Sequence, residues 1–363
     1  MIRVAMISFW HVHAHDYMRQ ALENPATEIV AAWDENPQRG RAEATALGVH
    51  FYESLDELLK QPDIDAVIID TPTSIHRDVM VAAARAGKHI FTEKVLATTL
   101  HECHEILAAV EKSGVKLAVS LPRLYHGYTL AIQQIVEQKV LGELTLVRTR
   151  LSHNGALRSP DRPNGWLPAH FYSLEQCGGG ALIDLGCHPM YLARLFLGLP
   201  ESVSAYYGYM TGREVEDNAV AVLQYPQGAL GIVEAGFVNH FSPLTIEIHG
   251  TEGSLFYGTP CVADRLSEAR HGSGVGDLNS KTEHRLLIRS TALGEEGSRQ
   301  WNDRTNRIPP DKPMAFQQWV THIQEGTTAD ENIQMALELT MLMEAANLSV
   351  QKKTAVKLTE LSI

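Results

Sequence analysis

Residues 65–94 read DAVIIDTPTSIHRDVMVAAARAGKHIFTEK, with strand-like apolar runs at 65–70 and 88–94 and an amphipathic helical segment between them. The helical segment, 76–87, repeats small and apolar side chains at helical spacing and ends at a glycine. A strand, a crossover helix and a second strand are the unit from which parallel sheets are built. The stretch therefore predicts a parallel sheet with helices packed on both of its faces.

The same alternation continues on both sides of this stretch, from residue 1 to about residue 120. The further strand-like runs are 2–8, 28–34 and 116–121, and the further helical segments are 16–24, 37–48, 54–61 and 100–114. Because crossovers between parallel strands are right-handed, this order predicts a doubly wound, Rossmann-like sheet in an α/β chain. We expect a first, dinucleotide-binding domain of this kind over residues 1–122.

The pattern changes after residue 122, where apolar runs follow one another closely and turns such as PQG and GTEG separate them. Such spacing is typical of antiparallel strands. The runs are 144–153, 202–210, 219–226, 229–238 and 244–250, and the helical segments are 129–139, 178–198 and a tail from residue 313. We interpret residues 264–312 as long polar loops in which only 286–289 resembles a strand. Residues 123–363 are thus expected to form a second, α+β domain with a mostly antiparallel sheet.

Composition narrows the class of protein. The chain has 363 residues, which favours two domains, and 31 Lys and Arg against 43 Asp and Glu give a net charge of −12. An acidic chain without a long basic run is a poor candidate for binding nucleic acid or an anionic membrane. A hydrophobic content of 44% with 20% charged residues excludes a disordered chain. Four scattered cysteines, no signal peptide and no long apolar run predict a cytoplasmic protein.

Ligands of open parallel sheets bind at the carboxyl ends of the strands, and the first such end is the turn from Ser8 to His13. A dinucleotide fingerprint places three glycines there, but Ser8, Trp10 and His13 stand at the glycine spacings. The Ser8 hydroxyl and an imidazole of His11 or His13 would then replace backbone donors to a pyrophosphate, while Trp10 points towards the cleft. Protonated imidazole binds phosphate better, so we expect cofactor affinity to strengthen as the pH falls from about 8 to 6.

Asp34 ends the second predicted strand, where a carboxylate accepts hydrogen bonds from an adenosine ribose and repels a 2′-phosphate. NAD is therefore the expected cofactor, with NADP as the alternative because Arg39 is close enough in sequence to reach a phosphate. The same carboxylate is also a good cap for the helix that follows.

His11, His13 and His15 allow a different hypothesis, because His-x-His after a first strand also opens metal-dependent TIM-barrel hydrolases. That fold needs eight strand–helix units, which the antiparallel second half does not offer. We therefore expect no metal site and interpret the three histidines as turn or cofactor contacts.

The strongest local signal is GGGALIDLGCHP at 178–189, where three glycines permit a tight turn at the start of a helix. Asp184 and His188 are four residues apart, so we expect them to share one helix face and to address one small molecule. An imidazole is the natural base for an alcohol proton near neutral pH. Glu93 and Lys94 place a carboxylate beside a lysine at another strand end.

Together these residues resemble the glucose–fructose oxidoreductase / inositol dehydrogenase (Gfo/Idh/MocA) family over nearly the whole chain. The motifs that carry the resemblance are DAVIIDTPTSIH, AGKHIFTEK, VLGEL, GGGALIDLGCHP, LGLPESV and IHGTEGSL, with Arg123 before the first helix of the second domain. The resemblance implies a Rossmann domain followed by an open, mostly antiparallel sheet through which members form homodimers or homotetramers. It also implies that a secondary alcohol and the ketone of a sugar, inositol or related polyol are interconverted with NAD or NADP.

The resemblance also assigns catalytic roles by position. His188 would exchange the hydroxyl proton, Lys94 would hydrogen-bond the same oxygen, and Asp184 would orient both the sugar and His188. Val95 stands where the family normally has a proline after Glu-Lys, often with a cis bond.

Cofactor and cleft contacts are carried over in the same way. Glu93 matches the residue near the nicotinamide ribose, and Arg123 and Trp166 match the walls of the cleft. The loop past the pyrophosphate and ribose is matched by Thr71, Pro72, Ser74 and His76.

Two other functions remain open at this point. The same scaffold supports NAD-dependent glycoside hydrolases, in which a transient oxidation at C3 acidifies C2 for elimination. A non-catalytic homologue that binds a nucleotide or a sugar would also be compatible with the altered turn after the first strand.

Overall fold

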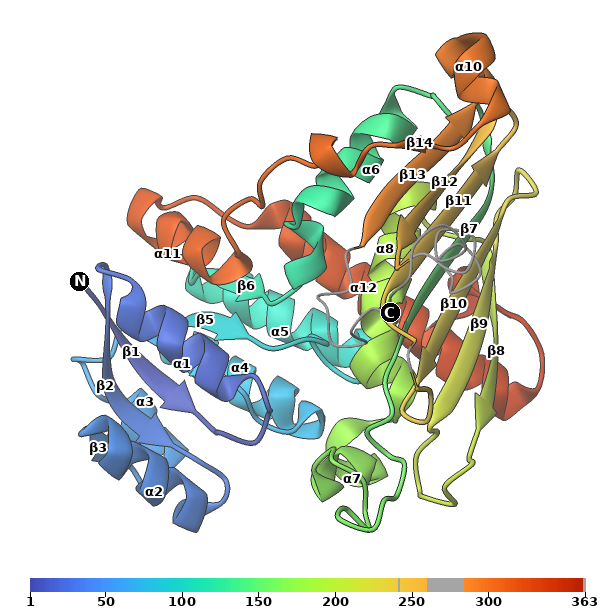
Figure 1. Ribbon diagram of the computed structural model, residues 1–363. Helices are drawn as coiled ribbons and strands as arrows, with labels where there is room; N and C mark the ends of the chain where they lie inside the picture. Colours follow the sequence, from blue (N-terminus) through green and yellow to red (C-terminus); the bar gives the residue numbers. More distant parts are fainter. Residues whose placement is uncertain (241, 260–283, 362–363) are drawn as a thin grey trace, which may run out of the picture.

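The computed structural model describes residues 1–240, 242–259 and 284–361, which form two sheets with helices packed against them (Figure 1). Within these ranges, one sheet has six strands in the order β3-β2-β1-β4-β5-β6. The other has nine strands in the order β14-β13-β12-β11-β7-β10-β9-β8-β15. The chain is therefore α/β overall, with a separate sheet in each half.

The first sheet is wholly parallel, as the sequence predicts. Its strands are β1 (Ile2–Ile7), β2 (Thr27–Trp33), β3 (His50–Phe51), β4 (Ala66–Ile69), β5 (His89–Thr92) and β6 (Leu117–Val119). The sequence does not predict β3, because two residues are too few to show an apolar pattern. The strand order reverses between β1 and β4, so their carboxyl ends meet at the switch point where such sheets bind ligands. The prediction of a doubly wound, Rossmann-like sheet is confirmed.

Five helices connect these strands, and polar side chains fix where they begin. The helices are α1 (Ala14–Glu23), α2 (Pro37–Leu47), α3 (Leu55–Leu59), α4 (His76–Arg85) and α5 (Leu100–Ser113). The Asn36 side chain accepts hydrogen bonds from the N–H groups of Gln38 and Arg39 at the start of α2. Thr99 and Glu102 form a capping box at the start of α5.

Helix α11 (Ala315–Glu325) comes from the second half of the chain but packs on the first sheet (Figure 1). The rings of Phe316 and Trp319 lie against Phe91 of β5, with centroids 5.3 and 5.8 Å away. The predicted boundary at residue 122 falls between β6 and α6 (Gly127–Glu137). The division into 1–122 and 123–363 stays a prediction, and the chain returns after it to cover the first sheet.

The second sheet is mostly antiparallel, and the described strands include one parallel pair, β7 with β10. Its strands are β7 (Leu144–Ser152), β8 (Ser202–Gly208), β9 (Asn218–Gln224), β10 (Leu230–Gly236), β11 (Thr245–Gly250), β12 (Gly253–Gly258), β13 (Arg285–Ser290), β14 (Asn302–Asp303) and β15 (Val356–Lys357). Helices α8 (Cys187–Leu197) and α12 (Asp330–Lys352) pack on one face, where Val203 and Ala205 are buried. The fold class predicted for the second domain is confirmed.

Within 264–312, the strand expected at 286–289 is confirmed as β13 (Arg285–Ser290), whereas the interpretation of the rest of the described part as loops is wrong. Residues 260–283 lie outside the described residues, but 284–312 contain β13, α10 (Gly294–Arg299) and β14. Strand β13 pairs with β12, and β14 pairs with β13. The apolar side chains Leu286 and Ile288 of β13 are buried, whereas the two-residue β14 forms because β13 offers hydrogen bonds, which a hydrophobic pattern does not reveal.

None of the helices in the described ranges combines the length and the apolar character needed to cross a membrane. Cys103, Cys177 and Cys187 are buried and free, and Cys261 lies outside the described residues.

Candidate active site

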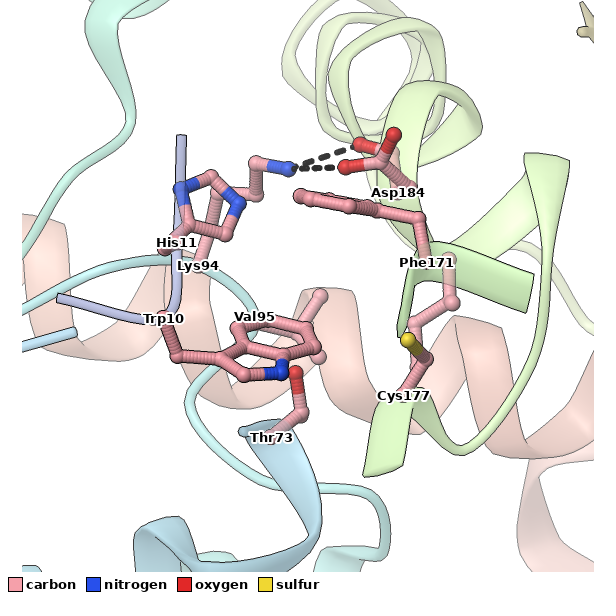
Figure 2. A pocket seen from close by; sticks show the side chains of 9 residues that line it. Trp10, His11, Thr73, Lys94, Val95, Phe171, Cys177 and Asp184 are labelled. Atoms are coloured by element: carbon pink, nitrogen blue, oxygen red, sulfur yellow. Dashed lines mark hydrogen bonds and ion pairs between the residues drawn. The ribbon is translucent and has the colours of Figure 1, made fainter. Parts of the chain in front are cut away.

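A narrow cavity lies where the carboxyl edge of the first sheet meets α7 (Leu174–Cys177) (Figure 2). Its lining residues are Trp10, His11, Thr73, Lys94, Val95, Phe171, Cys177, Ile183 and Asp184. The volume is about 20 Å³, enough for about one water molecule. The two halves of the chain are thus in close contact here, and a larger ligand requires the lining side chains to move apart.

Lys94 follows β5, and its ammonium group joins the two halves of the chain. Lys94 Nζ donates to the Asp184 carbonyl oxygen at 2.8 Å and to Asp184 Oδ1 at 3.0 Å (Figure 2). It also lies 3.6 Å from Glu93 Oε1. Burial alone would lower the pKa of Lys94, but the negative charges of Asp184 and Glu93 raise it above its ordinary value. Lys94 is therefore a charged hydrogen-bond donor, and its peptide bond to Val95 is cis.

A π-helical turn, Leu182–Gly186, presents Asp184 to Lys94. The turn follows the glycine run, and a Cβ at Gly180 would lie 2.1 Å from the carbonyl oxygen of Glu216, so only glycine fits there. The Glu216 carboxylate accepts hydrogen bonds from Gly180 N–H and Leu182 N–H, both at 2.9 Å. The glycine run and the buried Glu216 together fix the position of Asp184.

His188 lies at the start of α8, and a tyrosine orients its ring. His188 Nδ1 is 3.0 Å from Tyr191 Oη, which also accepts a hydrogen bond from Arg123 N–H at 3.1 Å. Burial lowers the pKa of His188 well below its ordinary value, so the ring is neutral at pH 7. The π-helical turn changes the helical spacing before His188, and the Asp184 carboxylate bonds to Lys94 instead (Figure 2). Tyr191, rather than Asp184, contacts the imidazole.

The turn after β1 adopts the backbone conformation of a glycine without containing one. Ser8 has a φ of 75°, in the left-handed region that favours glycine, and its Oγ accepts a hydrogen bond from Trp10 N–H at 3.1 Å. The Trp10 indole reaches across the cleft, where Nε1 donates to Gln176 Oε1 of α7 at 2.7 Å. Its ring stacks on Phe171 with centroids 5.2 Å apart. Trp10 therefore closes the cleft that a dinucleotide fingerprint would leave open.

The three histidines of this turn have separate partners. His11 Nδ1 accepts a hydrogen bond from His13 N–H at 3.2 Å, so Nε2 carries the ring proton. His13 and His15 pair with Asp16 and Glu43, each at 3.1 Å. The described residues contain no cluster of three His, Cys, Asp or Glu arranged to hold a metal ion.

Protonation of His11 between pH 8 and 6, which the sequence analysis invokes for phosphate binding, is not supported. Burial lowers the pKa of His11 well below its ordinary value, and the charge of Lys94 lowers it further. His11 is therefore a neutral donor in the cleft through that pH range.

Asp34 lies directly after β2, and donors already surround its carboxylate. Arg39 donates to it from Nε at 2.8 Å and from Nη2 at 2.7 Å, and the N–H groups of Phe9 and Asn36 donate at 2.9 and 2.7 Å. Arg39 also bonds to Glu35 at 2.6 Å. The carboxylates of Asp34 and Glu35 thus both pair with the Arg39 guanidinium.

The loop after β4 lies beside the Lys94–Val95 peptide. His76 Nδ1 is 3.0 Å from the Val95 carbonyl oxygen, and Nε2 is 3.2 Å from the Thr71 carbonyl oxygen. The Thr71 hydroxyl is buried and has no hydrogen-bond partner among the described residues. The remaining predicted members of this loop are Pro72 and Ser74, which flank the cavity-lining Thr73. The loop therefore has an unused donor next to the candidate cleft.

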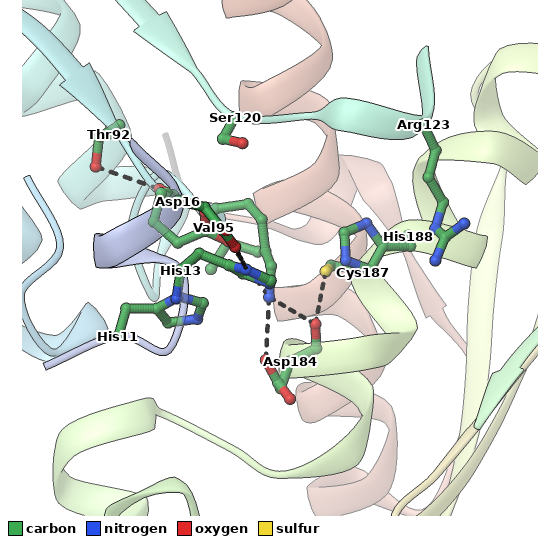
Figure 3. Close-up of polar contacts among 12 residues, drawn as sticks. His11, His13, Asp16, Thr92, Val95, Ser120, Arg123, Asp184, Cys187 and His188 are labelled. Carbon is green, nitrogen blue, oxygen red and sulfur yellow. Dashed lines mark hydrogen bonds and ion pairs between the residues drawn. The ribbon is translucent and has the colours of Figure 1, made fainter. Parts of the chain in front are cut away.

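The two predicted cleft walls lie outside the cavity of Figure 2. Arg123 lies near His188 (Figure 3), and its Nη1 donates to Tyr128 Oη at 3.3 Å. Its Nε is buried and has no hydrogen-bond partner in the part of the chain that the structure describes. Trp166 is 44% exposed, and its Nε1 donates to Asn154 Oδ1 at 3.1 Å. Arg123 is thus part of the same side-chain group as His188, whereas Trp166 lies at the surface.

Several residues of this site have no signal in the sequence. Phe171 and Gln176 follow a polar loop and become site residues only because Trp10 packs on them. Tyr191 reads as part of an apolar helix face. Asp70 is the exception. It directly follows the apolar run of β4, so a search for polar residues at strand ends would have found it.

The residues at this edge fit a dinucleotide, provided that the cleft opens. Ser8 has the left-handed backbone conformation of a fingerprint glycine, so the turn can still bring its backbone close to a pyrophosphate. Helix α1 begins shortly after this turn. The buried, unpartnered Thr71 hydroxyl faces the same edge from the neighbouring strand. Opening requires the Trp10–Gln176 hydrogen bond to break.

Comparison with known proteins identifies the family of this chain. A model of the oxidoreductase family with an NAD-binding Rossmann fold matches residues 2–121, and a model of the GFO/IDH/MocA C-terminal domain matches residues 129–256. The chain belongs to the Gfo/Idh/MocA family. A relative with 31% identity over 268 residues is scyllo-inositol 2-dehydrogenase (NAD(+)) of Bacillus subtilis, covering 71% of this chain and 74% of that protein.

One further relative and one solved structure are similar to this Gfo/Idh/MocA chain. The 1,5-anhydro-D-fructose reductase of Ensifer adhaerens is 29% identical over 246 residues, covering 67% of this chain and 72% of that protein. The structure of aldose-aldose oxidoreductase from Caulobacter crescentus superposes with a TM-score of 0.75 at 21% identity, covering 98% and 99% of the two chains. At that identity the superposition shows a common fold.

Proposed function

We propose that the protein is an NAD(P)-dependent oxidoreductase that interconverts a secondary alcohol and a ketone on a sugar, inositol or related polyol. The observation that carries this proposal is the charged Lys94, held between Asp184 and Glu93 at the carboxyl end of β5. An ammonium group there stabilises the negative charge that develops on an alcohol oxygen as its proton leaves. The inositol dehydrogenase and anhydrofructose reductase among the relatives support a polyol or sugar substrate.

His188 is the proposed proton acceptor. When Nδ1–H donates to Tyr191 Oη, Nε2 is unprotonated and free to take the hydroxyl proton. Lys94 donates a hydrogen bond to the same substrate oxygen, and Asp184 holds Lys94 in place. NAD, when bound, supplies the acceptor for the hydride that leaves the carbinol carbon. In the reverse direction His188 returns the proton to the oxygen of the ketone.

The cofactor contacts are proposed on their positions at the same edge. Ser8, Trp10, His11 and His13 form the turn nearest the pyrophosphate, and Asp34 lies where an adenosine ribose binds in Rossmann domains. The further proposed contacts are Thr71, Pro72, Ser74, His76, Glu93 and Lys94. Arg123, with Trp166 at the surface, is the proposed substrate wall.

A binding screen followed by a turnover assay tests the function. Thermal-shift measurements with NAD, NADP and a panel of sugars and polyols identify the ligands, and the absorbance of reduced nicotinamide then follows turnover. We expect a nicotinamide cofactor to raise the melting temperature and a polyol to be oxidised with net formation of NADH or NADPH. Retained NAD with cleavage of a glycoside and no net NADH would instead indicate the hydrolase reaction.

We also propose that the protein is a cytoplasmic homodimer or homotetramer that associates through the second sheet. The face of this sheet opposite α8 and α12 exposes Tyr206, Val220 and Leu230, which lie on three neighbouring strands. Exposed apolar side chains on one sheet face, with Tyr206 directly opposite Val220, favour association with a second copy. Three buried free thiols support a reducing compartment.

A further inference from the structure

Two acidic residues lie side by side at the carboxyl edge of the first sheet, and one of them has no role in the proposed reaction. Asp70 follows β4 and Glu93 follows β5, and the last paired residues of these strands are Ile69 and Thr92. Asp70 and Glu93 are therefore in register on neighbouring strands, with Cα atoms about 4.8 Å apart and side chains on the same face of the sheet.

Asp70 is buried in an unusual way. Its exposed fraction is 0%, and neither carboxyl oxygen has a hydrogen-bond partner among the described residues. A buried carboxylate without hydrogen-bond donors loses its hydration and forms no hydrogen bonds in its place, so its ionised form is strongly destabilised. An ionised Asp70 next to an ionised Glu93 would be less favourable still.

The donors around the pair all address Glu93. From α1, the Tyr17 hydroxyl bonds to Glu93 Oε2 and lies 2.7 Å from Ser120 Oγ, which follows β6. From the chain after β5, Lys94 Nζ lies 3.6 Å from Glu93 Oε1. The loop after β1 contributes a hydrogen bond from His11 N–H, but to the carbonyl oxygen of Asp70 and not to its side chain.

The other elements packed at this edge bring no charge to Asp70. Helix α11 contributes Phe316 and Trp319, which are apolar neighbours of Phe91. His13 lies beyond Tyr17, with ring centroids 6.4 Å apart, and pairs with Asp16. Among the described residues, the Asp70 carboxyl thus has two ionisable neighbours, Glu93 and the Tyr17 hydroxyl, and the hydroxyl bonds to Glu93.

We propose that Asp70 is a neutral carboxylic acid that donates its proton to Glu93, and that it is a positioning residue of the cleft. One proton shared between the two carboxyl groups explains why Asp70 has no donor: its partner is an acceptor. The pair then carries one negative charge, which faces Lys94. The effect of this pair on catalysis rests on the proposed role of Lys94. The shared proton itself does not depend on that role.

The electrostatics agree with this arrangement. Burial raises the pKa of Asp70 well above its ordinary value, and the charge of Glu93 raises it further. A carboxyl whose pKa is raised by folding binds its proton more tightly in the native state than in the unfolded state. Its contribution to stability is fully present below the unfolded pKa of about 4 and is lost as the pH rises through the folded pKa.

This arrangement also gives a new cause for a pH-dependent cofactor affinity. Above its folded pKa, Asp70 adds a second negative charge to an edge that must accept an anionic dinucleotide. Affinity should therefore strengthen as the pH falls, as the sequence analysis predicts, but through Asp70 and not through His11.

The variant Asp70→Asn tests the proposal, because asparagine keeps the shape and a donor but cannot ionise. The matched control is Asp63→Asn, which neutralises an exposed acid in the segment that leads into β4. Thermal melts at pH 5, 7 and 9 compare the three proteins. We expect Asp70→Asn to gain roughly 2 °C or more over wild type between pH 5 and pH 9, with no such gain for the control. A variant that loses stability relative to wild type as the pH rises would overturn the proposal.

Infrared spectroscopy of the wild type decides the matter even if the variant does not fold. A neutral carboxylic acid has a carbonyl stretch distinct from that of a carboxylate, and exposed acids are ionised at pH 7. We expect a neutral-acid band in wild type at pH 7 that is missing in Asp70→Asn. Burial also raises the pKa of Glu216, so a second band can occur in both proteins. Absence of any band from wild type, or a band of unchanged intensity in Asp70→Asn, would refute a protonated Asp70.

Titrations with NADH examine the functional part separately. We expect the wild-type Kd to rise with pH, by up to about tenfold per pH unit above the folded pKa, and that of Asp70→Asn to stay flat. If the Kd for NADH depends on pH equally in wild type and Asp70→Asn, the charge of Asp70 has no effect on cofactor binding. Failure of either protein to bind NADH would count against the proposed function, while the melts and the infrared band would still decide the protonation of Asp70.

Discussion

The imidazole of His188 is buried, neutral and held through Nδ1 by Tyr191, which leaves Nε2 as the base. His188→Ala is expected to lower kcat by about a hundredfold or more, the usual contribution of a general base. Calorimetric binding of NAD should be nearly unchanged, because the ring contacts Tyr191 and not the turn after β1. Turnover close to that of wild type would make His188 structural and leave Lys94 as the proton carrier.

Asp34 sets the expected preference between the two nicotinamide cofactors. Its carboxylate and that of Glu35 already hold Arg39, so little positive charge remains for a 2′-phosphate. We expect NAD to bind more tightly than NADP in calorimetry, and Asp34→Ala to reduce that preference by freeing Arg39. Equal or tighter binding of NADP by wild type would contradict the assignment of Asp34.

Between elements, the decisive contact is the one from the β1–α1 turn to α7, where Trp10 donates to Gln176. A dinucleotide must break this hydrogen bond, whose net contribution is about 1 kcal/mol. Gln176→Ala should therefore tighten NAD binding by roughly fivefold, measured by calorimetry. Glu175→Ala, which alters an exposed side chain of the same short helix, is the control. If NAD binds more weakly to Gln176→Ala but not to the control, the Trp10–Gln176 hydrogen bond must persist when NAD is bound.

At this same scale the sequence predicts some features and misses others for physical reasons. Strands such as β4 and β5 are buried on both faces, so a continuous apolar run reveals them. The apolar run at 286–289 likewise reveals β13, but the two polar residues of β14 form a strand only through hydrogen bonds to β13. The π-helical turn before His188 depends on Glu216, 28 residues further along. Motif spacing therefore locates Asp184 and His188 but does not give their partners.

For the whole molecule, the uncovered face of the second sheet is the proposed interface between copies. Tyr206 and Val220 are directly opposite each other on β8 and β9, and both are exposed. Replacing both by glutamate places like charges against each other across a two-fold interface. Sedimentation should show a dimer or tetramer for wild type and a single chain for Tyr206→Glu/Val220→Glu. The control Leu22→Glu changes an exposed side chain on α1. A monomeric wild type would rule out the interface.

The measurement that tests the proposed function most directly is hydride transfer itself, followed as nicotinamide absorbance with the polyol found in the binding screen. Wild type and Lys94→Met are compared at saturating NAD, because methionine keeps much of the lysine volume but removes the charge. We predict net NADH from wild type, and a loss of at least a hundredfold in kcat for Lys94→Met even at NAD concentrations that compensate for its lost cofactor contact. Bound cofactor without NADH formation from any sugar or polyol, or unchanged turnover in Lys94→Met, would contradict the assignment.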